Sequence, residues 1–275
     1  MQKIAAIQMA SGPNLSANLI EVERLIAKAV QAGAKLVALP ENFAMMGMDE
    51  HDKLDYQEVL DAPGPLQQFL SQTAKKNQIW LIGGTIPVSS PDPDKIYACS
   101  ILYNDKGEYV THYNKIHLFD VRIEESQEKY QESLTIASGN RVVVVDTPFG
   151  RLGMAVCYDL RFPGLFQQMA EQRVEIISLP SAFTAITGKA HWDILVRARA
   201  IESLSYLIAP AQGGYHRNGR ETYGHTMIVD PWGVVLDKLQ SGSGYVIAPL
   251  DCKRQGEIRR NFPTLKHRRT SCQLL

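Results

Sequence analysis

The chain alternates short apolar runs with segments in which apolar residues recur at helical spacing. Residues 3–10 (KIAAIQMA) are almost all apolar, as in a buried strand, and apolar positions three and four residues apart follow over 19–29. Gly33 stands where a helix C-cap is expected, and 35–40 (KLVALP) is a second apolar run. The first forty residues therefore predict a β-α-β unit, whose two strands are normally parallel neighbours.

The same alternation continues and predicts one α/β domain over residues 1–275. Further strands are expected at 79–88, 98–104, 109–117, 142–146, 151–159, 175–180, 223–230 and 244–251. Helices are expected at 66–77, 162–172 and 191–206. The last helix would carry Ile194, Ala198, Ile201 and Leu204 on one face. Residues 117–141 are polar and aperiodic, which favours a functional loop in a compact domain.

Charge and composition narrow the classes of partner. Lys plus Arg (29) balance Asp plus Glu (29), so no global field draws the protein onto nucleic acid or an anionic membrane, and a small-molecule or peptide partner is favoured. The N-terminal apolar run of about seven residues is too short for a signal peptide, and no run approaches the ~18 to 20 apolar residues of a membrane span. The four cysteines fit neither a disulfide framework nor a paired metal site. We therefore expect a cytoplasmic protein without a metal.

Three residues at predicted strand ends have the chemistry of an amide hydrolase. Cys157 ends an apolar strand and precedes a polar turn, whose backbone N–H groups can face a developing oxyanion. Glu41 follows directly on another strand, and Lys115 lies near the end of a third. A thiol needs a base, and a tetrahedral intermediate needs a fixed cation or N–H groups. The alternatives are a buried structural cysteine, a helix-capping glutamate and a solvated lysine.

Other chemistries have weaker support. His117 or His191 could partner Cys157 in a Cys-His hydrolase, but no motif fixes either histidine. The chain has no GxSxG, HExxH or Walker A sequence. The basic C-terminal segment lacks interleaved aromatic residues, which favours a solvated surface over an RNA site.

The strings LPENF around Glu41, YNKIHLFD around Lys115 and AVCYDLRFP around Cys157 resemble, in this order, the motifs of the nitrilase superfamily. The resemblance extends from residue 3 to about 269. It implies a four-layer α-β-β-α sandwich in which Glu41 is the general base, Lys115 stabilises the oxyanion and Cys157 is the nucleophile. Glu132 in YQESLTIASG matches a further glutamate, which would orient Lys115 and the hydrolytic water. No metal or organic cofactor is implied.

Within the superfamily the chain is similar to the deaminated glutathione amidase branch, through the segments 181–203, 223–233 and 267–269. This similarity implies the hydrolysis of deaminated glutathione to 2-oxoglutarate and cysteinylglycine, a metabolite-repair reaction. An ω-amidase, which cleaves 2-oxoglutaramate, shares much of the scaffold and is the first alternative. A catalytically weak interaction module is the second, although it would have no reason to keep three reactive groups together.

The resemblance also implies residues that bind the substrate. Arg161, Phe183 and Thr187 match positions that contact the acyl part, where Arg supplies a fork for a carboxylate, Thr a hydroxyl and Phe an apolar wall. Tyr158 would offer its backbone N–H to the oxyanion. The alternatives are an ion pair of Arg161 with Asp159 or Glu171 and core packing of Phe183.

Two further expectations concern surfaces of the molecule. The loop 213–221 (GGYHRNGRE) carries Arg217 and Arg220, which could bind a departing dipeptide that ends in a carboxylate. The helix after Cys157 carries an apolar stripe through which we expect a homodimer, as in related proteins; the alternative is that the stripe only covers the sheet. The stripe consists of Phe162, Leu165, Phe166 and Met169.

Overall fold

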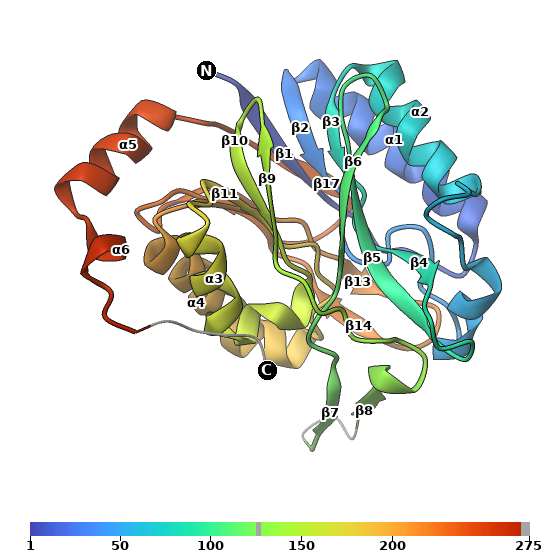
Figure 1. Cartoon of the computed structure of the whole chain (residues 1–275). Coiled ribbons are helices and arrows are strands. Elements are labelled where there is room, and N and C mark those ends of the chain that lie inside the picture. The colour runs from blue at the N-terminus through green and yellow to red at the C-terminus, as the bar shows by residue number, and fades with distance from the viewer. Residues whose placement is uncertain (125–127, 271–275) are drawn as a thin grey trace.

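The protein is described here from a computed structural model that covers residues 1–124 and 128–270. Two β-sheets pack face to face between two layers of helices, so the expected α-β-β-α sandwich is confirmed (Figure 1). The helices are α1 (Leu15–Gln31), α2 (Pro65–Asn77), α3 (Pro163–Glu171), α4 (Ala185–Ser203), α5 (Cys252–Asn261) and α6 (Thr264–His267).

The first sheet contains the N-terminal and C-terminal strands side by side. Its order is β17 (Gly244–Pro249), β1 (Lys3–Gln8), β2 (Ala34–Ala38), β3 (Trp80–Ile82), β5 (Ile96–Tyr103) and β4 (Ile86–Ser89), and β6 (Tyr109–Asn114) also pairs with β5. Strands β1 and β2 are parallel, which confirms the predicted β-α-β unit. The predicted strand 79–88 is two strands, because the chain turns at Gly83 and Gly84.

The second sheet carries the sequence around Cys157. Its order is β16 (Val235–Leu239), β15 (Thr226–Val229), β12 (Tyr206–Ala209), β11 (Ile176–Ser178), β10 (Gly150–Met154) and β9 (Val143–Thr147). The predicted strand 151–159 is shorter than expected, because β10 ends at Met154 and a 3₁₀ turn begins at Cys157. The nucleophile candidate therefore lies beyond the strand and not within it.

The two-residue side-chain period of the strands divides the core into two parts. In β1, Ala5 and Ile7 pack toward α1 and α2, whereas Ile4 and Ala6 face the second sheet. The inner faces of the two sheets, together with α3 and α4, form one continuous apolar cluster. Both faces of the first sheet are therefore buried, which explains why its strands read as unbroken apolar runs.

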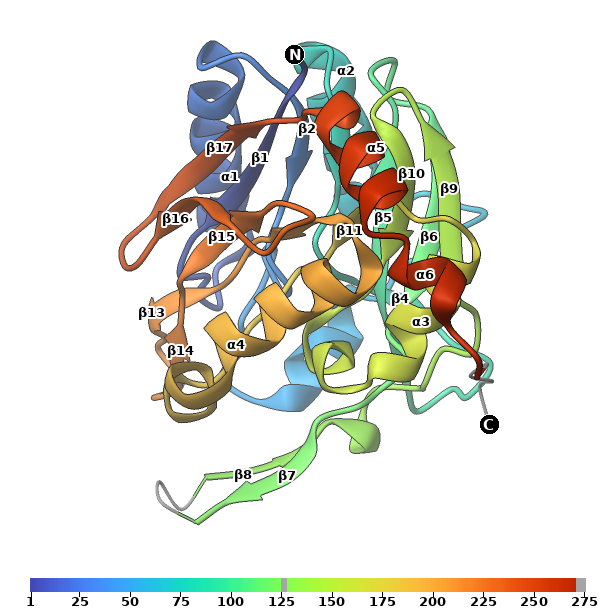
Figure 2. The same cartoon turned by 90° about the vertical axis from the view of Figure 1, so that its left-hand side faces the viewer.

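Two short hairpins lie outside these sheets, in places where loops were expected. β7 (Asp120–Ile123) pairs with β8 (Glu128–Gln131) and projects from the body of the molecule (Figure 2). β13 (Gly213–Tyr215) pairs with β14 (Glu221–Tyr223), so the segment 213–221 contains β13, the turn and the start of β14. Residues 125–127, which belong to the predicted loop 117–141, lie outside the described residues.

Two expectations about helix faces were wrong. Ile194 and Ile201 are 70% and 43% exposed, because α4 buries the opposite face, with Trp192, Val196 and Ala200. The apolar stripe of α3 covers the second sheet, which is the alternative stated above, since its central residues pack against that sheet and are at most 2% exposed. These residues are Leu165, Phe166 and Met169.

Candidate active site

A tight turn after β2 places Glu41 in the interior. Asn42 adopts a left-handed backbone conformation (φ 55°), and its N–H donates to Thr85 Oγ1 at 2.9 Å. Gly84 lies so close to this turn that a Cβ atom there would come within 2.2 Å of the Pro40 carbonyl oxygen. The turn therefore requires glycine at position 84, and it leaves the Glu41 side chain only 5% exposed.

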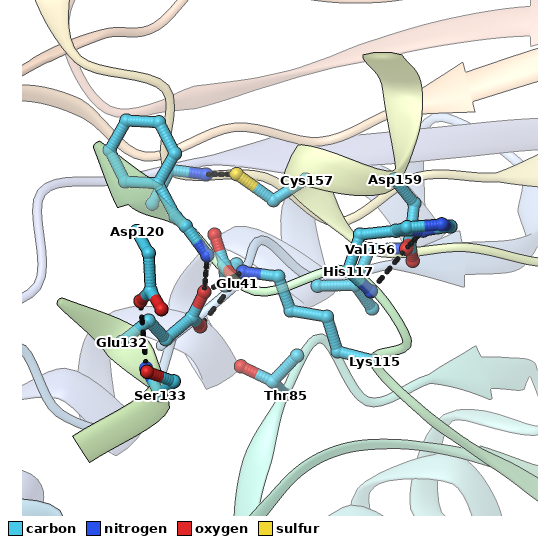
Figure 3. A network of polar contacts seen from close by, with 12 residues as sticks. Glu41, Thr85, Lys115, His117, Asp120, Glu132, Ser133, Val156, Cys157 and Asp159 are labelled. Carbon is cyan, nitrogen blue, oxygen red and sulfur yellow. Dashed lines mark hydrogen bonds and ion pairs between the residues drawn. The ribbon is translucent and has the colours of Figure 1, made fainter. Parts of the chain in front are cut away.

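Lys115 is held between two carboxylates (Figure 3). It follows β6 directly, and its backbone N–H donates to the Ala98 carbonyl of the neighbouring strand β5. Its Nζ atom donates to Glu41 Oε1 at 2.9 Å and to both carboxylate oxygens of Glu132 at 2.8 Å. Glu132 is itself fixed, since its Oε2 atom accepts the Phe119 N–H at 2.6 Å. The ammonium therefore has a defined position despite its long side chain.

Cys157 occupies a strained position at the start of the 3₁₀ turn Cys157–Arg161. Its φ angle is 47°, a left-handed conformation that side-chain-bearing residues adopt at a cost of about 1–3 kcal/mol and that clusters at functional sites. Its backbone N–H donates to the Pro180 carbonyl, and the Ala182 N–H approaches its Sγ atom at 3.5 Å. The loop after β11 therefore holds both the backbone and the sulfur of this residue.

Asp159 joins the segment of Lys115 to the segment of Cys157. This fully buried carboxylate accepts from Tyr113 Oη at 2.7 Å and from the His117 N–H at 3.0 Å, on either side of Lys115. It also contacts His117 Nδ1 at 2.7 Å and accepts the Val156 N–H at 2.9 Å. His117 thus serves as a partner of Asp159, and it does not line the active-site pocket as a Cys-His base would.

The electrostatics of the cluster favour a neutral thiol beside an ionised base. Burial, and then the neighbouring Glu41 carboxylate, raise the pKa of Cys157 well above its usual value. Burial alone would raise the pKa of Glu41, but the Lys115 ammonium and hydrogen bonds outweigh it and hold that pKa below its usual value. Burial opposes the charge of Lys115, yet Glu132 and Glu41 raise its pKa well above the usual range. The thiol therefore needs a base, and an ionised carboxylate lies next to it.

A pocket opens over these groups and brings together every residue that was predicted to be catalytic or to contact the acyl group and the oxyanion. The lining comprises Glu41, Asn42, Glu50, Lys53, Lys115, Phe119, Tyr130, Gln131, Glu132, Cys157, Tyr158, Arg161, Ala182, Phe183, Thr184, Thr187 and Arg220.

The predicted substrate contacts are on the wall formed by the 3₁₀ turn and α4. The Arg161 guanidinium lies over the rings of Phe183 and Tyr158, at 5.2 and 5.8 Å, and donates to His191 Nδ1 at 3.0 Å. The alternative ion pairs of Arg161 are not formed, because Asp159 is already engaged and Glu171 pairs with Arg268. The Thr187 hydroxyl is within hydrogen-bonding distance of the Thr184 hydroxyl, at 2.8 Å.

The opposite wall contains residues that sequence reasoning missed or misplaced. Glu50, Lys53 and Tyr130 come from the turn after Met48 and from β8, which carry no apolar period. Arg220 lines the pocket, whereas Arg217 is exposed and does not. The expectation that both arginines face the substrate was therefore wrong for Arg217.

Among residues 1–124 and 128–270, no three or more His, Cys, Asp or Glu side chains form a cluster that could hold a metal ion. Nor does this part of the chain contain a helix with the length and apolar character needed to span a bilayer.

Comparison with known proteins gives the chain its family. The carbon-nitrogen hydrolase family model matches residues 3–260. A deaminated glutathione amidase of Yersinia enterocolitica is 42% identical over 97% of this chain and 92% of its own length. The crystal structure of Saccharomyces cerevisiae Nit3, a nitrilase-superfamily member, superposes with a TM-score of 0.88 at 33% identity, covering 98% of this chain and 97% of Nit3.

The NitFhit protein of Caenorhabditis elegans superposes with a TM-score of 0.89 at 34% identity. The match covers 98% of this chain but only 65% of the NitFhit chain. Both structures share the sandwich with this protein over nearly its whole length. The predicted relationship is thus confirmed, and this chain belongs to the carbon-nitrogen hydrolase family of the nitrilase superfamily.

Proposed function

We propose that Cys157, Glu41 and Lys115 hydrolyse a linear amide through a thioester. The observation that carries this proposal is the convergence of a buried thiol, an ionised carboxylate and a fixed ammonium in one pocket. Glu41 takes the thiol proton as Sγ attacks the amide carbonyl carbon. The oxyanion that forms lies between Lys115 Nζ and the backbone N–H of Tyr158, at the start of the 3₁₀ turn, where first-turn N–H groups lack helical partners.

The second half of the reaction uses the same groups. Glu41 returns the proton to the leaving nitrogen, the carbon–nitrogen bond breaks and the amine departs. Glu41 then takes a proton from a water molecule held near Glu132, and the resulting hydroxide attacks the thioester carbonyl. The carbon–sulfur bond breaks, the acid is released, and the proton returns to Cys157. The atoms and protons of both steps are supplied by the substrate, water and the side chains of this protein.

We propose deaminated glutathione as the substrate, with 2-oxoglutarate and cysteinylglycine as products in a metabolite-repair reaction. The relative named above carries that activity in its name. Arg161 and Thr187 on one wall suit the 2-oxo acid end of the acyl group, because a guanidinium and a hydroxyl together bind a carboxylate. An ω-amidase that cleaves 2-oxoglutaramate has the same acyl group and remains the second candidate.

One assay separates the two candidates. The purified enzyme is given each amide, and ammonia and cysteinylglycine are measured separately. We expect kcat/KM for deaminated glutathione to exceed that for 2-oxoglutaramate by at least roughly tenfold, since only the larger substrate uses both walls of the pocket. Faster hydrolysis of 2-oxoglutaramate would assign the protein to the ω-amidases.

We also propose that the whole chain works as one catalytic domain in the cytoplasm. Glu41 and Lys115 follow strands of the first sheet, and Cys157 follows a strand of the second. Neither sheet alone therefore carries all three catalytic groups. The described cysteines Cys99, Cys157 and Cys252 are all free thiols, and a thiol nucleophile must stay reduced to react.

A homodimer remains our proposal, through a different surface from the α3 stripe. Exposed apolar side chains of α4, the 230–234 turn and the end of α5 form an apolar face. Trp232 and Phe262 are in ring contact at 5.6 Å, and Ile201 packs against Gly233. The apolar face consists of Ile194 (70% exposed), Ile201, Trp232, Val234 and Phe262.

We expect sedimentation at micromolar concentration to give a dimer. Ile201→Glu should shift the protein to a monomer, because a charge in an apolar interface must be desolvated. Ile20→Glu is the matched control, since Ile20 is an exposed isoleucine on α1, in the other helix layer. A monomeric wild type, or equal behaviour of both variants, would contradict a dimer through this face.

A further inference from the structure

A second, more open cavity continues from the active-site pocket to the surface. This outer groove is formed by residues 46–53, β8 and the 218–220 turn. It shares Glu50, Lys53, Tyr130 and Arg220 with the active-site pocket. Arg161 and Thr187 do not belong to it. The outer groove therefore adjoins the active-site pocket through these shared residues, and Cys157 lines only the pocket.

The charged residues shared by pocket and groove give the junction one excess positive charge, whereas the groove as a whole is balanced, because it is also lined by Asp49, Glu128 and Lys129. Lys53 Nζ pairs with Glu50 Oε2 at 3.1 Å, and this ammonium lowers the pKa of Glu50. Those two charges balance each other. The guanidinium of Arg220 lies at the same junction, 5.0 Å from the centre of the Tyr130 ring, and adds a further positive charge.

One hydrogen bond holds the Arg220 side chain in place, and a second N–H donor of its guanidinium has no partner in the described part of the chain. Its Nη2 atom donates to the Ala182 carbonyl at 2.6 Å, and the N–H of the same residue approaches the Cys157 sulfur. The distance between the guanidinium and the nucleophile is therefore set by one short backbone segment. Its Nε atom is buried and has no hydrogen-bond partner among residues 1–124 and 128–270. A buried donor without an acceptor is costly, so a ligand acceptor would be bound favourably there.

We propose that Arg220, supported by Lys53, binds the terminal carboxylate of a peptidic leaving group that lies in the outer groove. This inference rests on the proposed function and adds a substrate class to it: amides whose amine portion is an amino acid or dipeptide with a free carboxylate. The two arginines then hold the two anionic ends of such a substrate, Arg161 the acyl end and Arg220 the amine end. A primary amide, which releases ammonia, has no atoms that reach the groove.

The first test compares two arginines of one hairpin. Arg220→Gln should lower kcat/KM for deaminated glutathione at least tenfold more than it lowers that for 2-oxoglutaramate, because only the larger substrate loses a charge-assisted contact. Arg217→Gln is the matched control, since it makes the same charge change at an exposed position outside both cavities. Equal losses of Arg220→Gln on both substrates would overturn the inference.

The second test leaves the protein unchanged. Deaminated glutathione whose glycine carboxylate is converted to a neutral amide should be hydrolysed by the wild type with a kcat/KM at least tenfold lower than that of the free acid. Equal rates for acid and amide would overturn the role of Arg220 while leaving the proposed function standing. If the wild type instead prefers 2-oxoglutaramate to the free acid, the proposed function itself fails.

Discussion

Replacing Cys157 by alanine should lower turnover by roughly 10⁴-fold or more while the protein stays folded, because a methyl group cannot form a thioester. The side chain is small, so its loss from the buried site leaves little space and should cost about 1 kcal/mol or less. Turnover of both keto-acid amides and the thermal midpoint of the variant check these two expectations. In the wild type, mass spectrometry of the acid-quenched enzyme should place the acyl group on Cys157.

Cys99 provides the matched control for this experiment. It is also a fully buried free thiol whose pKa is raised by burial, but it lies in β5 and does not line the pocket. Cys99→Ala should therefore reduce stability as much or more and leave turnover nearly unchanged. An acyl group trapped on another residue, or an active Cys157→Ala, would refute the nucleophile.

Replacing Lys115 by alanine should cost several orders of magnitude in turnover. Removing one oxyanion donor typically costs about 3–4 kcal/mol. In addition, the variant loses the charge that keeps Glu41 ionised, so burial would raise the pKa of Glu41 and a larger fraction of the base would be protonated at neutral pH. A change confined to KM would contradict this role of Lys115.

The same variant also tests stability, because it leaves Glu41 and Glu132 without their shared cation. Breaking a buried ion pair in this way costs about 3–5 kcal/mol. Without the ammonium, burial raises the folded-state pKa of Glu41, so the deficit should be largest at neutral pH and shrink as the pH falls toward about 4. The double variant Lys115→Ala, Glu132→Gln should regain much of the stability but none of the turnover, which separates the two effects.

The sheets and the reactive groups could be predicted from the sequence because their signals are local. Apolar runs marked the strands, and the motifs placed Glu41, Lys115 and Cys157 at strand ends. The hairpin β7–β8 could not be recognised, because it lies outside the core and burial alternates only between half-buried and exposed along β8. Its residues nevertheless form one wall of the site, through Tyr130 and Gln131.

The buried face of α4 was missed for another reason. The face that packs on the core includes Arg199, whose Nε atom donates to the Leu160 carbonyl and whose guanidinium lies over Phe166. A charged residue at a core position interrupts the apolar pattern of the buried face. The exposed Ile194 and Ile201 produce an apolar pattern on the other face, which is not buried. Only the tertiary structure shows that the arginine is satisfied and the isoleucines are not covered.

The position of the site across the two sheets has a consequence for how this core can change over time. Glu41 follows a strand of one sheet and Cys157 a strand of the other, so the separation of base and nucleophile depends on how the inner faces interlock. Residues such as Ala6 and Met154 lie in that interface and do not line the pocket. Volume-conserving exchanges there are tolerated by the fold at a cost of about 1.5 kcal/mol or less. Such exchanges would nevertheless shift one sheet relative to the other and change the distance between Glu41 and Cys157. We therefore expect substitutions in this interface to lower the reaction rate before they lower the melting temperature.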